Sequence, residues 1–276
     1  MDADPMAEPG ANTETNAATG GQASSAEKWT GERVLSIRHW TPSLLSFRST
    51  RPAGFRFTPG HYARLGLGPD DGVLWRPYSM ASAPDEDFLE FIAVLVPGGE
   101  FSEQLRHIRV GDTLRVDKAC YGFLTVDQLA PGKDLWLLAS GTGLGPFVAI
   151  LRDPAVWRDF ARLILVHSVR HAAELAWRDE IAALPGLFEQ TTATLRYIPI
   201  VTREPGATDL AERIPLLLAD GRLEAAAATP LSLADSRLMV CGNPEMARDL
   251  RQFLSSRGYA TNRRGVRGQM AFEKYW

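Results

Sequence analysis

A change in strand pattern near residue 130 constrains the fold more than any other feature of this chain. Four continuous apolar runs follow that point, at residues 135–140, 163–168, 195–202 and 237–242. Segments with a helical pattern separate these runs, among them 172–184 and 244–258. Strands buried on both faces are continuously apolar, and their alternation with helices is typical of a parallel sheet. Residues 130–276 are therefore expected to form a parallel α/β domain.

The preceding hundred residues have a different pattern. Short stretches that alternate or run apolar are separated by Gly, Pro or Asp, at 32–40, 44–50, 61–68, 89–96 and 112–119. Regular short strands with turn residues between them indicate an antiparallel barrel or sandwich. Residues 28–129 are expected to form this domain, with a short helix at 102–108 and a boundary near 129–133.

Residues 1–27 differ from both domains in composition. They are rich in Ala, Gly, Thr, Glu and Asn, and apart from the methionines their apolar side chains are small. Such a segment buries too little surface to offset its loss of conformational entropy. It is expected to be a disordered tail.

Composition and charge exclude several classes of protein. The net charge is −3, whereas a nucleic-acid-binding domain would carry a clustered basic excess. The two cysteines, Cys120 and Cys241, are too few for a four-thiolate cluster and lie far apart. A reducing, cytoplasmic environment is expected. No apolar run approaches 18 residues and no secretory signal is evident, so no membrane span is expected.

A glycine-rich stretch, GTGLGPF at 141–147, follows the first apolar strand of the second domain and opens a helix. Glycines allow a backbone to approach a pyrophosphate, and a helix N-terminus offers unpaired N–H groups and a favourable dipole. Pro146 suits the first turn of a helix, where no N–H is needed. The stretch therefore favours a dinucleotide site, although a tight turn without a ligand has the same glycines.

A second unusual stretch is RPYSMAS, residues 76–82. It places a cation, an aromatic ring and hydroxyl groups within seven residues, as a flavin site would require. An ordinary edge strand with an exposed arginine is the alternative. A third motif, CGNPEM at 241–246, comes at the end of a late strand.

The order of these motifs resembles one family. RxYS, GTGxxP, CGNPxM and a terminal aromatic are similar to those of the ferredoxin–NADP reductase family, specifically the bacterial ferredoxin/flavodoxin–NADP reductases, over roughly residues 29–276. The resemblance implies an N-terminal antiparallel β-barrel that binds FAD non-covalently and a C-terminal parallel α/β Rossmann-like domain that binds NADP(H). It also implies hydride transfer between NADPH and N5 of FAD, followed by single-electron transfers to a separate ferredoxin or flavodoxin.

The resemblance assigns the FAD contacts. Arg76 would pair with the pyrophosphate, Tyr78 would pack on the isoalloxazine ring, and Ser79 would hydrogen-bond near N5. The C-terminal rings would fold back onto FAD, one over the isoalloxazine face as a gate and one near the adenine, although chain-end aromatics are often simply packed. The implied contacts are Arg76, Pro77, Tyr78, Ser79, Phe101, Ser102, Thr142, Tyr275 and Trp276.

The resemblance also assigns an NADP site. Its implied contacts outside the arginines are Gly141, Thr142, Gly143, Gly145, Pro146, Cys241, Gly242, Asn243 and Met246. NADP rather than NAD is expected because cations stand where an NAD site would offer an acidic residue. These cations are Arg170, Arg203 and Arg213, each of which could instead be an ordinary surface charge.

Four residues are implied at the reaction centre: Ser79, Tyr275, Cys241 and Glu273. Cys241 would lie near the nicotinamide, although a lone cysteine is commonly a small buried apolar residue. Glu273 is a candidate proton relay to the flavin. No metal is expected, because His167 and His171 have helical spacing but His167 falls at a strand end.

The expected partner is an acidic acceptor protein, so a basic rim near the flavin is expected from Arg106, Arg109 and Lys118. Nothing in the sequence requires more than a monomer. Two other readings stay open: a flavin reductase or oxygenase reductase component, and a non-catalytic FAD-dependent sensor module.

Overall fold

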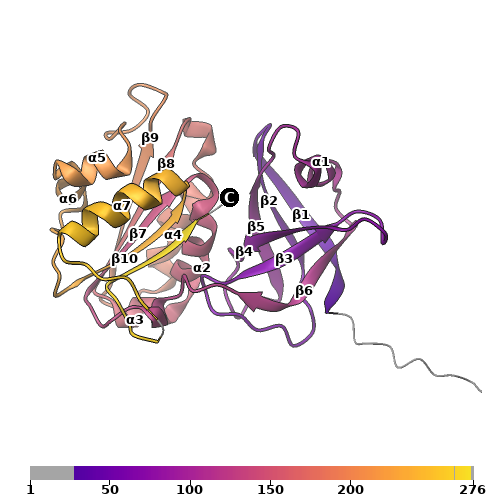
Figure 1. Cartoon of the computed structure of the whole chain (residues 1–276), viewed down its shortest axis with the longest axis horizontal. Helices are drawn as coiled ribbons and strands as arrows, with labels where there is room; N and C mark the ends of the chain where they lie inside the picture. The colour runs from indigo at the N-terminus through magenta and orange to yellow at the C-terminus, as the bar shows by residue number, and fades with distance from the viewer. Residues whose placement is uncertain (1–27, 264, 275–276) are drawn as a thin grey trace, which may run out of the picture.

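The computed structural model describes residues 28–263 and 265–274, which form two sheets that lie side by side (Figure 1). The first sheet is antiparallel, with the spatial order β4-β3-β6-β1-β2-β5. Its strands are β1 (Trp29–Thr41), β2 (Leu44–Thr50), β3 (Tyr62–Leu67), β4 (Leu74–Ser79), β5 (Phe88–Val94) and β6 (Thr113–Tyr121). Helix α1 (Glu100–His107) lies between β5 and β6 in the chain.

The two edges of this sheet meet. Beyond the end of β4, the backbone N–H of Ala81 donates to the carbonyl oxygen of Glu90 in β5 (2.7 Å). The sheet therefore curves round into the expected barrel. Its interior is apolar: Phe47 and Phe91 lie opposite one another on β2 and β5, with ring centroids 5.4 Å apart. Burial of each such ring stabilises the fold by about 2–3 kcal/mol.

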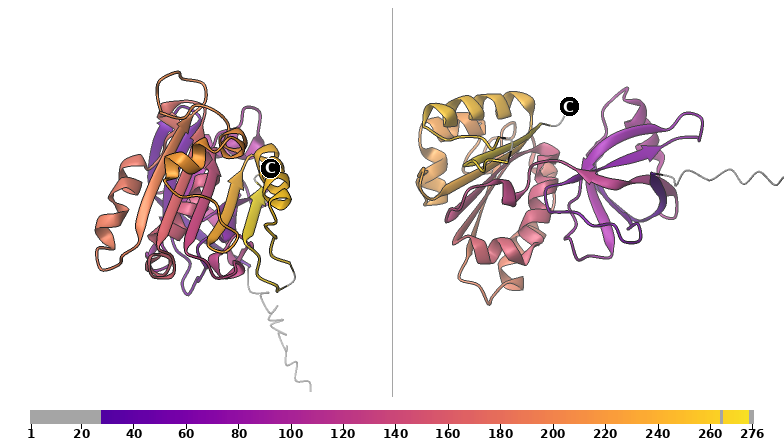
Figure 2. Two further views of the ribbon diagram at one scale, coloured as in Figure 1. Left: turned by 90° about the vertical axis from the view of Figure 1, so that its left-hand side faces the viewer. Right: turned by 60° about the horizontal axis from the view of Figure 1, so that its bottom comes forward.

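The second sheet is parallel throughout, with the spatial order β11-β10-β7-β8-β9. Its strands are β7 (Asp134–Ser140), β8 (Arg162–Val169), β9 (Thr194–Val201), β10 (Ser236–Gly242) and β11 (Met270–Lys274). The α-helices around it are α2 (Leu144–Arg152), α3 (Pro154–Asp159), α4 (Arg178–Leu187), α5 (Ile214–Ala219), α6 (Arg222–Ala227) and α7 (Pro244–Ser256). The left view of Figure 2 shows helices on both sides of this sheet.

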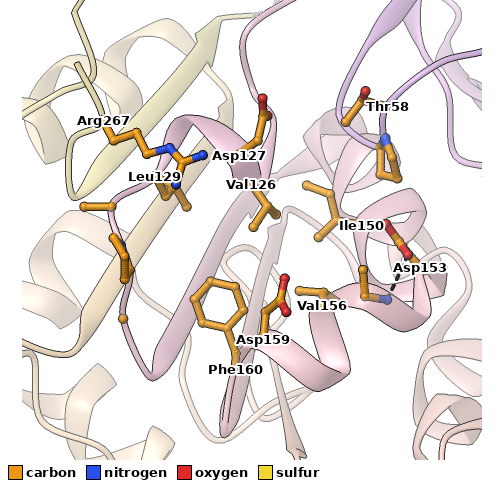
Figure 3. Close-up of a pocket in the computed structure, with 15 residues that line it drawn as sticks. Thr58, Val126, Asp127, Leu129, Ile150, Asp153, Val156, Asp159, Phe160 and Arg267 are labelled. Carbon is orange, nitrogen blue, oxygen red and sulfur yellow. Dashed lines mark hydrogen bonds between the residues drawn. The ribbon is translucent and has the colours of Figure 1, made fainter. Parts of the chain in front are cut away.

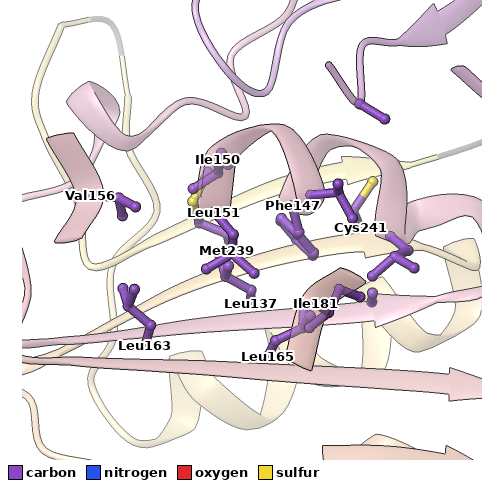
Figure 4. Packing of buried hydrophobic residues seen from close by; sticks show 14 of the residues in the cluster. Leu137, Phe147, Ile150, Leu151, Val156, Leu163, Leu165, Ile181, Met239 and Cys241 are labelled. Atoms are coloured by element: carbon purple, nitrogen blue, oxygen red, sulfur yellow. The ribbon is translucent and has the colours of Figure 1, made fainter. Parts of the chain in front are cut away.

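Successive strand residues point to opposite faces, and each face has its own core. Leu137 and Leu165 pack with Phe147 and Ile150 of α2 and with Ile181 of α4 (Figure 4). On the other face, strand residues pack against α5, α6 and α7, for example Trp136, Leu138, Leu217, Leu223 and Leu250. This confirms the expected α/β arrangement.

The expectation of one helix over 172–184 is wrong. A 3₁₀ turn covers Ala172–Glu174, and α4 starts only at Arg178. Trp177 lies between them with φ of 54°, where no helix can continue. Its buried ring packs edge-on against Trp40 of the barrel, with centroids 6.0 Å apart. A tertiary contact therefore overrides the helical pattern.

Four elements are absent from the sequence-based expectation, α3, α5, α6 and β11, and β4 was only the alternative for residues 76–82. The three helices have six residues each and β11 has five. Segments this short give too few periods for a pattern to show. None of the helices in the described ranges is long and apolar enough to cross a membrane. The domain limits of 28–129 and 130–276 stay a proposal, and residues 1–27 lie outside the described part.

Helix α2 connects the two sheets. At its C-terminal end, the Arg152 guanidinium donates to the carbonyl of Ala81 (2.9 Å) and to the carboxylate of Glu90 (2.6 Å). Glu90 is 4% exposed and also accepts from Arg48 (3.0 Å). A buried carboxylate thus joins the barrel to the helix that follows the glycine-rich turn.

Replacing Glu90 with Gln is expected to destabilise the protein by about 3 kcal/mol, because Arg152 would then be a largely buried cation that has lost its ion-pair partner. Urea unfolding of both proteins measures this difference. Lys133→Gln is the matched control, since it removes an exposed ion pair with Asp235 and should cost under about 1 kcal/mol. Equal losses in the two variants would contradict a structural role for the buried pair.

Candidate active site

The glycine-rich turn lies at the carboxyl end of β7, where open parallel sheets bind their ligands. Gly141–Gly143 form a 3₁₀ turn that leads into α2. Gly141 has φ of 54°, and a Cβ added there would meet no atom within 4 Å. The backbone above Gly141 is therefore open to a ligand, and Thr142 is partly exposed beside it.

Strand β10, the neighbour of β7 in the sheet, packs against this turn. A Cβ on Gly143 would lie 2.4 Å from the Cys241 carbonyl oxygen, so only glycine permits the contact. The Ser140 hydroxyl oxygen accepts from the backbone N–H of Asn243 (2.8 Å). The Asn243 side chain in turn caps α7 by accepting from the N–H groups of Glu245 and Met246. The GTG and CGNPEM motifs therefore form one structural unit, which also holds Gly242 and the buried Pro146.

The RPYSMAS stretch begins within β4. Arg76 and Pro77 are exposed, whereas Ser79 is buried. Tyr78 packs against Phe101 of α1, with ring centroids 5.6 Å apart, and burial raises the pKa of its phenol to about 12. The Ser102 hydroxyl oxygen accepts from the backbone N–H of Val96 and orders the loop before α1 (3.0 Å). A cation, a neutral phenol ring and a helix N-terminus thus lie on one edge of the barrel.

Ser79 lies where the barrel meets the parallel α/β domain. Its hydroxyl donates to the carboxylate of Glu273 (3.2 Å), across a sequence separation of 194 residues. Glu273 pairs with the fully buried Cys241 across β10 and β11. On the other side, a Cβ on Gly145 in α2 would lie 3.9 Å from the Ser79 carbonyl oxygen. The structure therefore brings Ser79, Cys241, Glu273 and the start of α2 together.

Glu273 is a partly buried carboxylic acid. Burial raises its pKa from 4.5 to about 7, and the hydrogen bond from Ser79 opposes this only in part. The carboxyl group lies against the β6 end, because a Cβ on Gly122 would be 3.3 Å from its Oε1 atom. An acid with a pKa near neutrality can give or take a proton at physiological pH.

The three predicted phosphate-binding arginines are exposed at the same end of the parallel sheet. Arg170 and Arg203 follow β8 and β9, and the backbone N–H of Arg203 donates to the Arg170 carbonyl (2.9 Å). Arg213 precedes α5 and forms a long, exposed ion pair with Glu245 at the start of α7 (3.5 Å). The backbone segments that carry Arg170 and Arg203 are therefore adjacent.

Two predicted site residues, Tyr275 and Trp276, lie outside the described residues. Two that the sequence analysis did not find are Ser140, which supports the turn between the motifs, and His167, whose Nε2 lies 3.0 Å from the Gly141 carbonyl oxygen. Their only signal in the sequence was position: Ser140 precedes the glycine-rich turn, and His167 is the second-to-last residue of the apolar run 163–168.

A separate cavity of about 520 Å³ lies at the opposite, amino-terminal edge of the parallel sheet (Figure 3). Apolar side chains such as Ile150 and Phe160 line it, and Asp127, Asp153 and Asp159 contribute carboxylates. Arg267 also lines the cavity, but three carboxylates against one guanidinium suit a pyrophosphate less well than the open turn at the end of β7. Among the residues that the structure describes, no group of three or more His, Cys, Asp or Glu side chains could hold a metal ion.

Comparison with known proteins gives matches to both halves of the chain. Residues 37–123 match the model of the oxidoreductase FAD-binding domain, and residues 137–252 match that of the oxidoreductase NAD-binding domain. The chain is 41% identical to ferredoxin–NADP reductase A of Sorangium cellulosum (89% of this chain, 90% of that protein) and 39% identical to ferredoxin–NADP reductase of Pseudomonas aeruginosa (88% and 96%). A ferredoxin NADP⁺ reductase from Neisseria gonorrhoeae, solved with bound FAD and NADP, superposes with a TM-score of 0.84 at 38% identity (90% and 99%).

The raised pKa of Glu273 predicts a pH-dependent stability. A group whose pKa is higher in the folded state stabilises the fold fully below its unfolded pKa of 4.5, and that contribution is lost as the pH rises through about 7. Relative to Glu273→Gln, the wild-type protein should therefore lose on the order of 2 kcal/mol between pH 4.5 and pH 7.5. Urea unfolding at a series of pH values measures this, and parallel curves for the two proteins would contradict the raised pKa.

Proposed function

The chain belongs to the ferredoxin–NADP reductase family, and from this premise we propose that it exchanges electrons between NADP(H) and a ferredoxin or flavodoxin through bound FAD. The observation that carries the proposal is that Ser79 of the RPYSMAS stretch meets two parts of the second domain, Glu273 on β11 and Gly145 in the first turn of α2. The barrel and the parallel α/β domain therefore come together at Ser79, and an enzyme that joins two cofactors needs their sites at one point.

The residues on the barrel edge fit FAD. The exposed guanidinium of Arg76 can pair with pyrophosphate oxygens, and the ring of Tyr78 offers an apolar face to the isoalloxazine. Gly98 precedes the N-terminus of α1 with φ of 74° and nothing within 4 Å of an added Cβ, so the backbone there is open to the phosphates. Phe101 buttresses Tyr78, and Ser102 orders the loop.

The turn at the end of β7 fits the phosphates of NADP. Gly141 gives an open backbone at the N-terminal end of α2, where N–H groups and the helix dipole favour anions. Arg170, Arg203 and Arg213 supply cations for the 2′-phosphate. We propose that this trio selects NADP over NAD.

At the reaction centre, bound FAD supplies the conversion between a two-electron donor and one-electron acceptors. The protein's own groups hold the neighbouring proton. The Ser79 hydroxyl donates to Glu273, which is half-protonated near neutral pH and can exchange a proton through that hydroxyl. Cys241, fully buried beside Glu273, limits the space at this point. We propose that Tyr275 covers the ring until nicotinamide enters and that Trp276 lies near the adenine.

A protein acceptor needs a surface close to Ser79. Tyr62 is the cross-strand partner of both Ser79 and Tyr121, and the rings of the two tyrosines are 5.7 Å apart. Phe123, two residues further on, is 77% exposed. Lys118 is exposed on the same end of β6. An exposed aromatic group with a nearby cation suits an acidic redox protein.

The other two predicted rim residues are less suited to this surface. Arg109 precedes β6, whose nine residues span about 26 Å, so its guanidinium belongs to the opposite end of that strand from Tyr121. Arg106 is in the last turn of α1 and pairs with Glu103 (3.6 Å). Lys118 is therefore the rim residue that we propose. A cytoplasmic location and a monomeric state stay predictions of the sequence.

The first test is anaerobic mixing of the purified holoprotein with NADPH and, separately, with NADH. The flavin absorbance should bleach much faster with NADPH. Arg203→Ala should raise KM for NADPH about tenfold or more, because a charge-assisted phosphate contact contributes about 1.5–3 kcal/mol, and should leave KM for NADH unchanged. Arg158→Ala, an exposed arginine on α3 at the other edge of the sheet, is the control. Absence of bound flavin would overturn the proposal; equal rates with NADH would remove the role of the arginines alone.

The acceptor surface has its own test. Lys118→Glu and Phe123→Ala should each raise KM for ferredoxin several-fold at low ionic strength, while NADPH oxidation with ferricyanide stays at the wild-type rate. Arg109→Glu, at the far end of β6, should change neither activity. Loss in both assays, or a larger effect of Arg109→Glu, would show that the surface is elsewhere. Activity with free FMN but not with ferredoxin or flavodoxin would favour a flavin reductase.

A further inference from the structure

His167 is a buried polar residue to which the proposed function gives no role. It lies near the end of β8 and is 1% exposed. Its Nε2 atom is 3.0 Å from the carbonyl oxygen of Gly141. Its Nδ1 atom has no hydrogen-bond partner among the residues that the structure describes.

The hydrogen-bond geometry fixes the tautomer. A carbonyl oxygen can only accept, so the proton is on Nε2, which donates to Gly141. Burial lowers the pKa of His167 to about 4, and Glu174 is the charged group that opposes this shift. The neighbours at the same level on β7 and β9 are Ala139 and Pro199, which carry no charge. The ring is thus neutral at physiological pH, with its single N–H directed at the turn.

The turn rests on two supports at the same level of the sheet. Cys241, Ala139 and His167 are successive cross-strand partners, on the face that α2 covers. The Cys241 carbonyl lies directly beneath Gly143. The His167 ring lies beneath Gly141. Thr142, between these two glycines, is therefore held from both sides.

Because the peptide unit is planar, the contact at the Gly141 carbonyl also sets the direction of the Thr142 N–H. The carbonyl of Gly141 and the N–H of Thr142 belong to one peptide unit and point in opposite directions. Two donors hold that carbonyl: the His167 ring and the backbone N–H of Leu144. With the carbonyl directed towards the sheet, the N–H of Thr142 is directed away from it. The backbone beside it is open, because a Cβ added at Gly141 would meet no atom within 4 Å.

We propose that His167 is a positioning residue for NADP(H): its Nε2–H fixes the peptide between Gly141 and Thr142 so that the Thr142 N–H faces the dinucleotide. The inference rests on the proposed function, and it adds a residue that itself touches neither cofactor. Histidine suits the position because it supplies one donor at the required reach and fills the space beneath the turn with a flat ring.

A pair of variants tests the reach of the donor. His167→Gln places an amide N–H near the position of Nε2, whereas His167→Asn holds its amide one methylene shorter and cannot reach Gly141. In single-turnover reduction of the holoprotein by NADPH, His167→Asn should raise the apparent Kd for NADPH about five- to tenfold, the equivalent of one hydrogen bond. His167→Gln should stay within about threefold of the wild type. His167→Leu should resemble His167→Asn.

The oxidative half-reaction separates positioning from a general structural role. Protein reduced with dithionite should pass electrons to ferredoxin at the wild-type rate in all three variants, because this step does not use the NADP turn. FAD content and Tm are measured on the same samples. If His167→Leu loses FAD or fails to fold, the proposal is tested by comparing His167→Asn with His167→Gln.

The outcomes are distinct from failure of the proposed function. A wild-type protein that NADPH does not reduce would overturn that function. A wild-type protein that is reduced normally, with equal NADPH affinity in the Asn and Gln variants, would overturn only the role of His167. Parallel loss of both half-reactions would also overturn it, since the residue would then support the fold rather than the turn.

Discussion

The packing of α2 against the antiparallel barrel is the constraint on which the rest of the site depends. At the first turn of the helix, Gly145 lies so close to Ile92 that an added Cβ would be 3.1 Å from its side chain. At the last turn, Arg152 binds the buried carboxylate of Glu90. Both ends of one helix are thus fixed to the barrel, and the glycine-rich turn before it acquires a fixed position relative to Ser79.

Close backbone approach recurs wherever the segments of this site meet. Gly143 lies on the Cys241 carbonyl, and Gly242 lies on Ser140 with a separation that no side chain would permit. Gly122 gives room to the Glu273 carboxyl group. Burial of this carboxyl group raises its pKa towards neutrality.

The fold class could be predicted because the spacing of apolar residues within one segment is enough to distinguish a strand from a helix. Continuous apolar runs such as 135–140 gave the parallel strands, and short alternating segments gave the barrel. The same reasoning failed at Trp177, where packing against Trp40 interrupts a helical pattern. It also missed β11, because a five-residue strand has too few periods to be distinguished from a loop.

By itself, the sequence determined which residue types are present and in which order: the cation, ring and hydroxyl of 76–79, the glycines of 141–145 and the strand-end arginines. Only the tertiary structure decided which of them meet. The hydrogen bond between Ser79 and Glu273 joins residues 194 positions apart. The hydrogen bond between His167 and Gly141 joins β8 to the turn after the adjacent strand β7. A local pattern carries the period of each element, but a contact between distant elements depends on how the two sheets and α2 pack, and no single segment encodes that distance.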